Sequence, residues 1–417
     1  MTSTDLRWEA MTINTVQKYN GRSLDSIEKI KTVARHIAKN RKPEDGLVIV
    51  VSAMGDTADK LIALAREAGD DLRKSEIDML LATGDQQTVA LLAIALQAAG
   101  VNAQAVAGLQ TDVMVDNPYA TVRCLNTSVI ENVLAEGKVA VVSGFQGVGE
   151  DGDLSMAGAG GSDITAVGIA AQLEWDCEIY SESECMYTVD PSVYPDAKPI
   201  KAITYEEMME VANLGADKIE TQAIELAKKC NVKLYYGKSL EDDKSKGTYI
   251  VNKELMATQN LLVEDAPITG MGIQDEVTIF TLRNIPSDGK AVAECFRILG
   301  ELGIVVDMIS QQMAQDGTCT VSFSCDMEAG DQLETALTSN EIFSGIVVDR
   351  EQNLAMISLV GVGMATHSGV SGKVFRVLAE NGVKYYHITT SEISISVTVE
   401  MDQKLSAAIA LCREFNL

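Results

Sequence analysis

A glycine-rich stretch, "MAGAGGSDITA" (Met156–Ala166), is the part of this 417-residue chain whose residue types most clearly suggest chemistry. It lies between a predicted strand and a predicted helix, and it contains Ser162 and Asp163. Such a turn lets backbone N–H groups approach a phosphate, and the helix N-terminus adds a favourable dipole. The stretch matches neither GxxxxGK[ST] nor a GxGxxG after a first strand. It is therefore either another kind of phosphate-binding turn or only a tight connection.

Polar residues at the ends of other predicted strands could complete a site around this turn. Lys18 ends the first strand and is followed by Gly21 and Ser23, while Ser52 and Gly55 follow a second strand in "VSAMGDT". The segment "TGDQ" is a further candidate ligand region. A lysine at such a place suits a transferring phosphoryl group, although it could simply be an exposed lysine at a strand end. Several polar positions at strand ends favour a site.

The elements that must position these residues alternate between strand and helix. "GLVIVVSAM" and "KVAVVSGF" are continuous apolar runs, which is typical of strands buried on both faces of a parallel sheet. "EIDMLLATGDQQTVALLAIALQAAG" has helical character and ends at a glycine. Strand, turn and helix in repeated order predict an α/β sandwich with a mostly parallel central sheet. Ligands of such sheets lie at the carboxyl ends of the strands.

The pattern changes near residue 260, where one order of elements occurs twice. A strand runs into a glycine-bearing loop, at Asp288-Gly289 in the first copy and Ser368-Gly369 in the second, and a helix and further strands follow. A βαββα repeat of this length predicts two ferredoxin-like α+β modules. Two compact modules behind an α/β domain suggest regulation.

The composition excludes several classes of protein. Sixty acidic residues against thirty-four basic ones give a formal charge of -26, which disfavours nucleic acid or an anionic membrane as a partner. The three histidines are far apart, so a zinc site or a Ser/His/Asp hydrolase is not expected. The eight scattered cysteines are predicted to be reduced and buried. Without a secretory signal or an 18-residue apolar run, a cytoplasmic location is expected.

Ordered segments along nearly the whole chain resemble the aspartate kinases of the amino-acid kinase family. They include "VQKYNGRSL", "VIVVSAMGDTADKL", "DMLLATGDQ", "VSGFQGV", "GAGGSDITA", "MYTVDP", "AIELAKKCNV" and "ITTSEISISVTV". The resemblance implies transfer of the γ-phosphoryl group of ATP, with Mg²⁺, to the side-chain carboxylate of L-aspartate. That reaction is the first step towards lysine, threonine and methionine. A carboxylate with a reference pKa of about 3.9 is already ionised at neutral pH and needs no general base.

The resemblance also implies an organisation into domains. A kinase domain is expected at residues 1–255, and two ACT modules at 265–340 and 341–417. ACT modules of this family sense end-product amino acids and assemble across chains, so an amino-acid effector and a homodimer or larger homo-oligomer are expected.

Site residues follow from the matching motifs. Catalytic roles are implied for Lys18 and Asp163. The expected substrate-binding residues are Ser23, Arg22, Ser52, Thr83, Asp85 and Ser162. The expected nucleotide-binding residues are Gly21, Gly160, Gly161, Ser181, Tyr187, Asp190 and Lys238. The expected effector-binding residues are Asp307, Gln311, Thr390, Ser391 and Glu392. No resident metal ligand is expected, and Asp307 could instead be only a charge at a strand edge.

The chain departs from the family's motifs where substrate would bind. The usual KFGGTS is "KYNGRS", TGE is "TGD", and RGGSD is "AGGSD", with Ala159 where an arginine grips the substrate carboxylate. Charged hydrogen bonds contribute about 1.5–3 kcal/mol each, so this loss would weaken aspartate binding about ten- to a hundredfold. In one explanation Arg22 supplies the missing guanidinium. In the other, the chain is a divergent paralogue that is weakly active, regulatory, or specific for another small acid.

Overall fold

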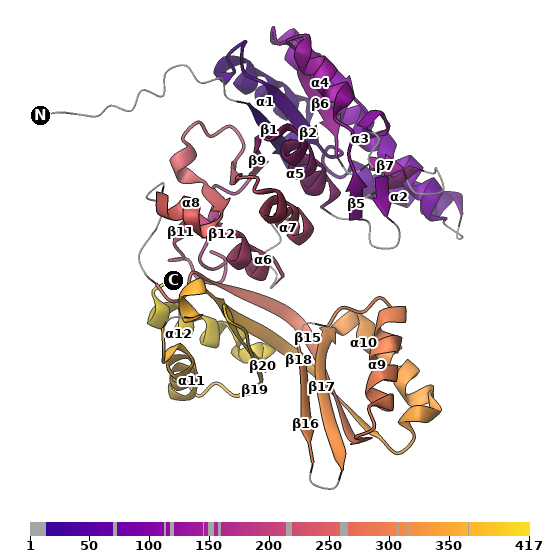
Figure 1. The fold of residues 1–417 in the computed structure, drawn as a ribbon, viewed down its shortest axis with the longest axis vertical. Coiled ribbons are helices and arrows are strands. Elements are labelled where there is room, and N and C mark those ends of the chain that lie inside the picture. The colour runs from indigo at the N-terminus through magenta and orange to yellow at the C-terminus, as the bar shows by residue number, and fades with distance from the viewer. Residues whose placement is uncertain are drawn as a thin grey trace, which may run out of the picture. The chain divides into compact units, whose positions relative to one another are not determined.

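The computed structural model describes residues 14–69, 73–111, 114–116, 121–144, 146–148, 154–156, 160–213, 219–258, 266–306, 308–314, 317–365 and 367–417. The chain divides into two compact units (Figure 1). The first comprises Met1–Tyr187, Pro199–Ala212 and Asp217–Glu264. The second comprises Thr188–Lys198, Asn213–Ala216 and Asp265–Leu417.

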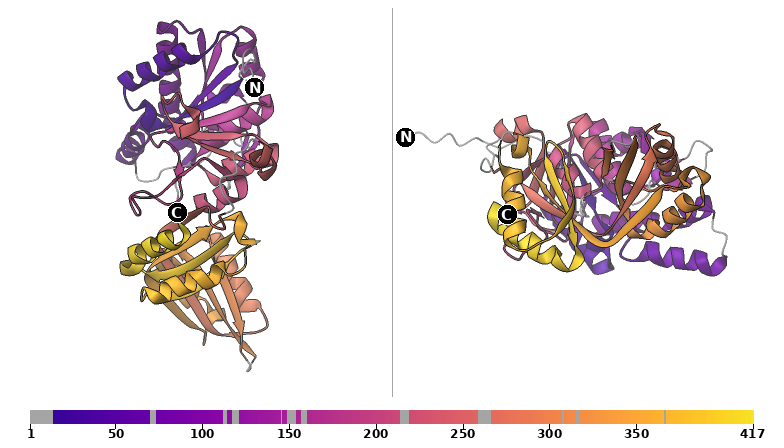
Figure 2. Two further views of the ribbon diagram at one scale, coloured as in Figure 1. Left: turned by 90° about the vertical axis from the view of Figure 1, so that its left-hand side faces the viewer. Right: turned by 90° about the horizontal axis from the view of Figure 1, so that it is seen from below.

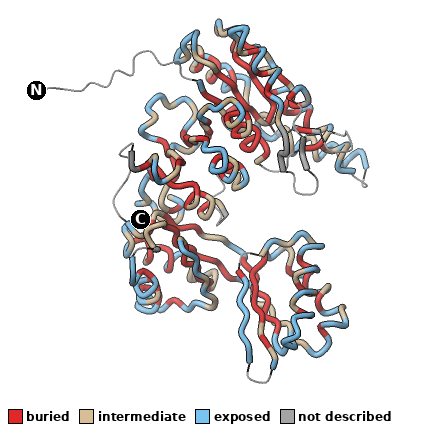
Figure 3. The backbone as a smooth tube through the Cα atoms, viewed as in Figure 1, coloured by how far each residue is buried: buried red, intermediate tan, exposed pale blue. Residues whose placement is uncertain are grey.

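An eight-stranded, mostly parallel sheet forms the centre of the first unit. Its strand order is β12-β14-β13-β9-β1-β2-β6-β3, and all neighbours from β13 to β3 are parallel. The strands are β12 (Ala202–Thr204), β14 (Thr248–Val251), β13 (Leu234–Lys238), β9 (Asp176–Ser181), β1 (Thr15–Tyr19), β2 (Leu47–Val51), β6 (Val139–Ser143) and β3 (Ala103–Val106). Every residue of β2 and β6 is buried, as their continuous apolar runs predict (Figure 3).

Helices cover both faces of this sheet. Alternate residues of β2, namely Leu47, Ile49 and Val51, pack with α1 (Ile27–Asn40) and α3 (Lys74–Ala98). The residues between them, Val48 and Val50, pack into a second core. That core is completed by α4 (Ser128–Ala135), α5 (Gly161–Leu173) and α7 (Thr221–Cys230). The α/β sandwich predicted from the sequence is confirmed.

Smaller elements complete the first unit. They are the helices α2 (Thr57–Ala68), α6 (Tyr205–Asn213) and α8 (Lys253–Thr258), the pair β10 (Met186–Tyr187) and β11 (Pro199–Ile200), and the sheet formed by β5 (Thr121–Cys124), β4 (Met114–Asp116), β7 (Gln146–Val148) and β8 (Leu154–Met156). Among the described residues, α3 is the one helix long and apolar enough to cross a membrane. Its Leu92 and Leu96 are buried in the core beside β2, which is typical of the core helix of a globular unit.

The second unit contains one antiparallel sheet in the order β16-β17-β15-β18-β20-β19 (Figures 1 and 2). Its strands are β15 (Gly270–Pro286), β16 (Ile309–Met313), β17 (Thr318–Asp326), β18 (Val347–Val360), β19 (Tyr385–Thr390) and β20 (Ser394–Glu400). Its helices are α9 (Lys290–Glu301), α10 (Met327–Ser339), α11 (Val370–Glu380) and α12 (Lys404–Phe415). Gly289 and Gly369 adopt φ angles of 76° and 92° directly before α9 and α11, in a region that favours glycine. The repeated order of elements predicted from the sequence is confirmed.

Two long strands join the two repeats. The first residues of β15, Gly270–Gln274, pair with the end of β18, whereas Ile279–Arg283 pair with its beginning. Only the second half of β15 pairs with β17, and only the second half of β18 pairs with β20. Each half of the sheet therefore has its own helices and its own core, while β15 belongs to both halves. The boundary between residues 340 and 341 stays a prediction.

The described cysteines are all free thiols. Six of them are buried as expected, but Cys230, the last residue of α7, is exposed, so the expectation of burial was wrong for that residue.

Candidate active site

A buried ion pair lies at the centre of the candidate site. Lys18 of β1 places its Nζ 2.7 Å from Oδ1 of Asp163 in the first turn of α5, and the two side chains are 9% and 7% exposed. Asp163 Oδ2 also accepts a hydrogen bond from the backbone N–H of Glu220 at 3.2 Å. Because a buried charge is costly without its partner, each member of the pair fixes the other. The pair presents an oriented ammonium group near the carboxyl end of a parallel strand.

The glycine turn brings the N-terminus of α5 against the neighbouring strand ends. Gly160 has a φ of 75°, and a Cβ there would lie 2.6 Å from Cβ of Glu220. A Cβ on Gly144, which follows β6, would lie 2.5 Å from Cβ of Ser162. Only glycine permits these approaches. As a result, the free N–H groups and the positive end of the α5 dipole lie where β1, β2 and β6 end.

The loops after β1 and β2 contact each other at the carboxyl ends of these strands. A side chain on Gly21 would overlap the carbonyl oxygen of Ala53, and the N–H of Gly55 donates to the Gly21 carbonyl at 2.9 Å. The Ser52 hydroxyl donates to the Ser162 hydroxyl at 3.0 Å. The glycines of both loops thus permit a close contact that positions hydroxyl groups next to the start of α5.

A network of hydroxyl groups connects the ends of β1, β9 and β13. Ser23 Oγ lies 2.7 Å from Ser239 Oγ and donates to Glu182 at 3.3 Å. The Ser239 N–H donates to the Ser181 carbonyl at 2.9 Å, and Ser181 Oγ lies 2.6 Å from the Tyr236 hydroxyl. Residues more than 200 positions apart in the sequence therefore meet at one edge of the sheet.

This arrangement suits transfer of a phosphoryl group. Such transfers depend on positioning and on neutralising charge spread over phosphoryl oxygens, and backbone N–H groups, a lysine and hydroxyl groups provide both. An ionised acceptor needs no general base, so the combination is chemically sufficient for a carboxylate acceptor.

Comparison with known proteins agrees with this chemistry. Residues 14–235 match the model described as "Amino acid kinase family", and residues 357–415 match an "ACT domain". The chain is 37% identical over 406 residues to an aspartokinase of Bacillus sp. (strain MGA3), which covers 96% of this chain and 97% of the relative. It is 38% identical over 405 residues to an aspartokinase of Geobacillus stearothermophilus, with the same coverage.

The chain belongs to the aspartokinase family. Solved structures of this family share its fold. E. coli aspartokinase III in complex with aspartate and ADP gives a TM-score of 0.78 at 20% identity, covering 96% of this chain and 99% of that one. The aspartate kinase of Clostridium acetobutylicum gives 0.75 at 21% identity, covering 96% and 100%.

The structure places the remaining residues that the aspartokinase motifs suggest for the first unit. Thr83 and Asp85 lie within α3, where Thr83 is exposed and donates to the Leu80 carbonyl at 2.7 Å, while Asp85 is buried. Arg22 is exposed, and its carbonyl accepts from Lys29. Ala159 lies outside the described residues.

The residues expected to bind nucleotide do not all fall in one unit. Gly160 and Gly161 begin α5, and Ser181 and Lys238 are register partners at the ends of β9 and β13. Lys238 is exposed and lies 3.7 Å from a carboxylate oxygen of Glu184. Tyr187 belongs to the first unit, where it ends the segment Met1–Tyr187. Asp190 belongs to the second unit, and its side chain accepts a hydrogen bond from the Ser192 N–H at 2.8 Å.

The residues expected to bind an effector lie in the second unit. Gln311 is exposed on the edge strand β16. Thr390 ends β19, and Ser391 and Glu392 lie in the turn before β20, where Ser391 accepts from the Ser394 N–H. These two places are on opposite edges of the six-stranded sheet, so one chain does not bring them together. Asp307 lies outside the described residues.

Sequence reasoning did not name Glu182, Ser239 or Glu220 as site residues. Glu182 accepts from both Asn20 and Ser23, and Ser239 completes the hydroxyl network. Glu182 directly follows β9, Ser239 directly follows β13, and Glu220 directly precedes α7. What the sequence lacked was the strand order that makes β1, β9 and β13 neighbours.

Proposed function

We propose that this chain transfers the γ-phosphoryl group of ATP to the side-chain carboxylate of L-aspartate, forming 4-phospho-L-aspartate. The observation that carries the proposal is the buried Lys18–Asp163 pair beside the N-terminus of α5. Asp163 holds the Lys18 ammonium in place, and the ammonium neutralises charge that develops on the phosphoryl oxygens. E. coli aspartokinase III, whose fold this chain shares, was crystallised with aspartate and ADP.

The nucleotide is assigned to the edge formed by β1, β9 and β13. The N–H groups of Gly160 and Gly161 face the phosphates, with Gly21, Ser181, Tyr187 and Lys238 as further candidates. Asp190, in the second unit, stays a candidate on its sequence motif alone. Mg²⁺ enters as Mg·ATP, because this ion keeps several waters and is held mainly by substrate phosphates.

Aspartate is assigned to the neighbouring loops after β1 and β2. Ser23, Ser52 and Ser162 offer hydroxyl groups, Asp85 is the candidate partner of the substrate amino group, and Thr83 is a further candidate. Arg22 is the candidate for the guanidinium that the motif lacks at Ala159. Its exposed side chain has no ion pair among the described residues and is available to turn towards a substrate carboxylate.

The second unit is assigned to regulation and assembly. E. coli aspartokinase III was also crystallised with lysine and aspartate, which supports an amino-acid effector here. We infer that Asp307, Gln311, Thr390, Ser391 and Glu392 contribute to effector binding between paired ACT modules of two chains. Because Gln311 and Ser391 lie on opposite sheet edges, pairing across chains is the way to bring such edges together. The enzyme is expected to be a cytoplasmic homodimer or larger homo-oligomer.

The direct test is ADP release from Mg·ATP with L-aspartate, with the acyl phosphate trapped as its hydroxamate. The same assay on Lys18→Ala is expected to lose about a hundred- to a thousandfold in kcat, as removal of one charge-stabilising donor does elsewhere. Turnover that depends on aspartate and on Lys18 supports the proposal. ATP binding without hydroxamate would indicate another phosphoryl acceptor. If the chain neither bound ATP nor turned over, only the ACT half would remain as its functional part.

A further inference from the structure

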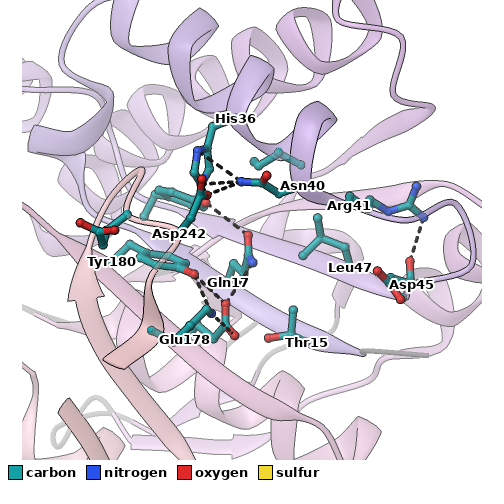
Figure 4. Close-up of a pocket in the computed structure, with 15 residues that line it drawn as sticks. Thr15, Gln17, His36, Asn40, Arg41, Asp45, Leu47, Glu178, Tyr180 and Asp242 are labelled. Atoms are coloured by element: carbon teal, nitrogen blue, oxygen red, sulfur yellow. Dashed lines mark hydrogen bonds and ion pairs between the residues drawn. The ribbon is translucent and has the colours of Figure 1, made fainter. Parts of the chain in front are cut away.

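A cavity of about 430 Å³ lies against one face of the central sheet (Figure 4). Its floor is formed by alternate residues of β1 and β9, including Gln17, Tyr19 and Tyr180. Helix α1 covers it with His36 and Asn40, among others. Because side chains alternate along a strand, Lys18 points to α5 while its two neighbours face this cavity. The volume suits a small molecule, and the cavity is not part of the candidate active site.

The floor of the cavity already binds one ammonium group, which belongs to the chain itself. Lys244 forms an ion pair with Glu178 and donates to the Tyr180 hydroxyl at 2.9 Å. Its Nζ also lies 4.7 Å from the ring centre of Tyr235 and 5.4 Å from that of Tyr180. Glu178 is only 14% exposed and accepts in addition from Gln17 at 3.0 Å. A carboxylate beside aromatic rings is an environment that attracts organic cations.

The charges around the cavity exclude one class of ligand and favour another. The carboxylates of Asp45, Glu178, Glu241 and Asp242 line it, against the permanent cations of Arg41 and Lys244. Burial lowers the pKa of His36, so this ring adds no charge near neutral pH. Lys246 and Lys39, which are not part of the lining, form ion pairs with Glu241 and Asp242. A guest with an ammonium group must therefore exchange with one of these lysines, while the carboxylates that face the cavity disfavour nucleotides and other phosphates.

The cavity is connected to the active-site edge through the β13–β14 connection. This connection starts with Lys238 and Ser239, and Ser239 contacts Ser23 and Ser181 in the hydroxyl network. A few residues later it carries Asp242 and Lys244 into the cavity wall. A guest that displaces Lys244 or engages Asp242 would therefore act on the segment that also holds the hydroxyl network.

We propose that this cavity is a second ligand site, for a small organic ammonium compound, and that its occupancy changes the affinity of the enzyme for Mg·ATP. The guest ammonium binds between the Glu178 and Asp242 carboxylates. The coupling to ATP rests on the proposed function, whereas the binding does not.

Binding is tested by titration calorimetry on the full chain with 1,5-diaminopentane, using 1,5-pentanediol as an uncharged probe of similar length. The diamine should bind and the diol should not. Glu178→Gln and the rim variant Asp242→Asn should each weaken the diamine about tenfold or more, since each removes a charge-assisted contact. Lys244→Met should raise the affinity for the diamine, because the Lys244 ammonium no longer competes for Glu178.

The matched control is Glu28→Gln, which removes an exposed carboxylate from the outer side of the same helix α1. It should leave diamine affinity unchanged. Equal weakening by Glu28→Gln would show only general attraction to an acidic protein and would overturn the site. Absence of diamine binding, or equal affinity in wild type and Asp242→Asn, would overturn it too, and Asp242 is exposed enough that its variant should fold.

Coupling is tested by the KM for Mg·ATP with and without saturating diamine. We expect a change of about fivefold or more in wild type, in line with usual allosteric couplings, and none in Asp242→Asn. Calorimetric binding with an unchanged KM would overturn the coupling. An enzyme without any turnover would refute the proposed function instead, because calorimetry does not depend on turnover.

Discussion

At the scale of single residues, the site combines one buried charge pair with several groups still open to solvent. Lys18 and Asp163 hold each other and belong to the rigid core, whereas Arg22 and Lys238 are exposed at the rim. Catalysis needs preorganised groups at the reacting atoms, and substrate capture tolerates mobile ones. This difference predicts which substitutions affect kcat and which affect KM.

Arg22→Ala tests whether the guanidinium missing at Ala159 has been replaced. If Arg22 grips the substrate carboxylate, the KM for aspartate should rise about tenfold or more, with little change in stability because the side chain is exposed. Steady-state kinetics at varied aspartate concentration measures this KM. The control is Lys29→Ala, since Lys29 contacts the Arg22 carbonyl and Asp25 on the same surface. An unchanged KM in Arg22→Ala would refute the replacement, and Ala159→Arg would then become the informative variant.

At the scale of elements, the position of α5 decides the geometry of the site. The N-terminus of this helix is in direct contact with the end of β6 at Gly144, and it carries both Ser162 and Asp163. A small movement of the helix would displace the hydroxyl and the carboxylate together. Activity should therefore depend on this contact more steeply than stability does.

Gly144→Ala should displace α5, because its Cβ would lie 2.5 Å from Cβ of Ser162. We expect kcat to fall about a hundredfold, together with destabilisation of about 1–3 kcal/mol from overpacking. The matched control is Gly168→Ala in the middle of α5, where the nearest atoms would be 3.9 Å away. That change should keep activity and stabilise by about 0.5–1 kcal/mol. Equal activity in both variants would show that the position of α5 is not critical.

Asp78 on α3 gives a prediction about pH. Burial raises the pKa of this carboxyl above its ordinary value, although the Met156 N–H donates to it at 3.0 Å. Since the folded state favours the protonated form of Asp78, its ionisation lowers the free energy of unfolding at neutral pH. This destabilisation disappears as pH falls through the raised pKa. Asp78→Asn should thus match or exceed wild-type stability at pH 7, and this advantage should shrink towards the ordinary pKa near 4. Urea unfolding between pH 4 and pH 8 measures the difference. A difference that grows on acidification would contradict the assignment.

The same elements show how far the sequence predicts the structure. Continuous apolar runs located β2 and β6, and glycine signals located the starts of α9 and α11. Lys18 and the start of α5 followed from strand–turn–helix order. Contacts such as Ser23 with Ser239 could not be predicted, because hydrophobic periodicity identifies a strand without giving its neighbours. Thr83 shows the related difficulty inside a helix, where its exposure depends on the packing of α3.

At the scale of the whole molecule, the two ACT modules differ in what they need from the rest of the chain. The first module finds all four of its strand segments and its core within residues 277–351. The second needs Gly270–Gln274 from the start of β15, and its core also includes Val189. The modules are therefore unequal even though their element order repeats.

Separate fragments should show this inequality. Residues 277–351 should fold alone, whereas residues 341–417 should remain largely unfolded because one side of β18 lacks its partner. Adding β15 in a 265–417 fragment should restore cooperative unfolding. Circular dichroism during thermal unfolding distinguishes these outcomes. Equal melting of 341–417 and 265–417 would contradict the shared-strand argument.

The core that contains Val189 also contains Leu411 and Cys412 of α12, together with Leu417, which is 3% exposed. During synthesis on a ribosome, the apolar side chains of Val189, Val193 and Tyr194 must therefore wait for α12 before their core is complete. The nascent chain carries these side chains in solvent for the time needed to add more than 200 residues, at about 5–20 per second. We expect a chaperone to protect these side chains during that time, and chains that stop before α12 to be degraded rapidly.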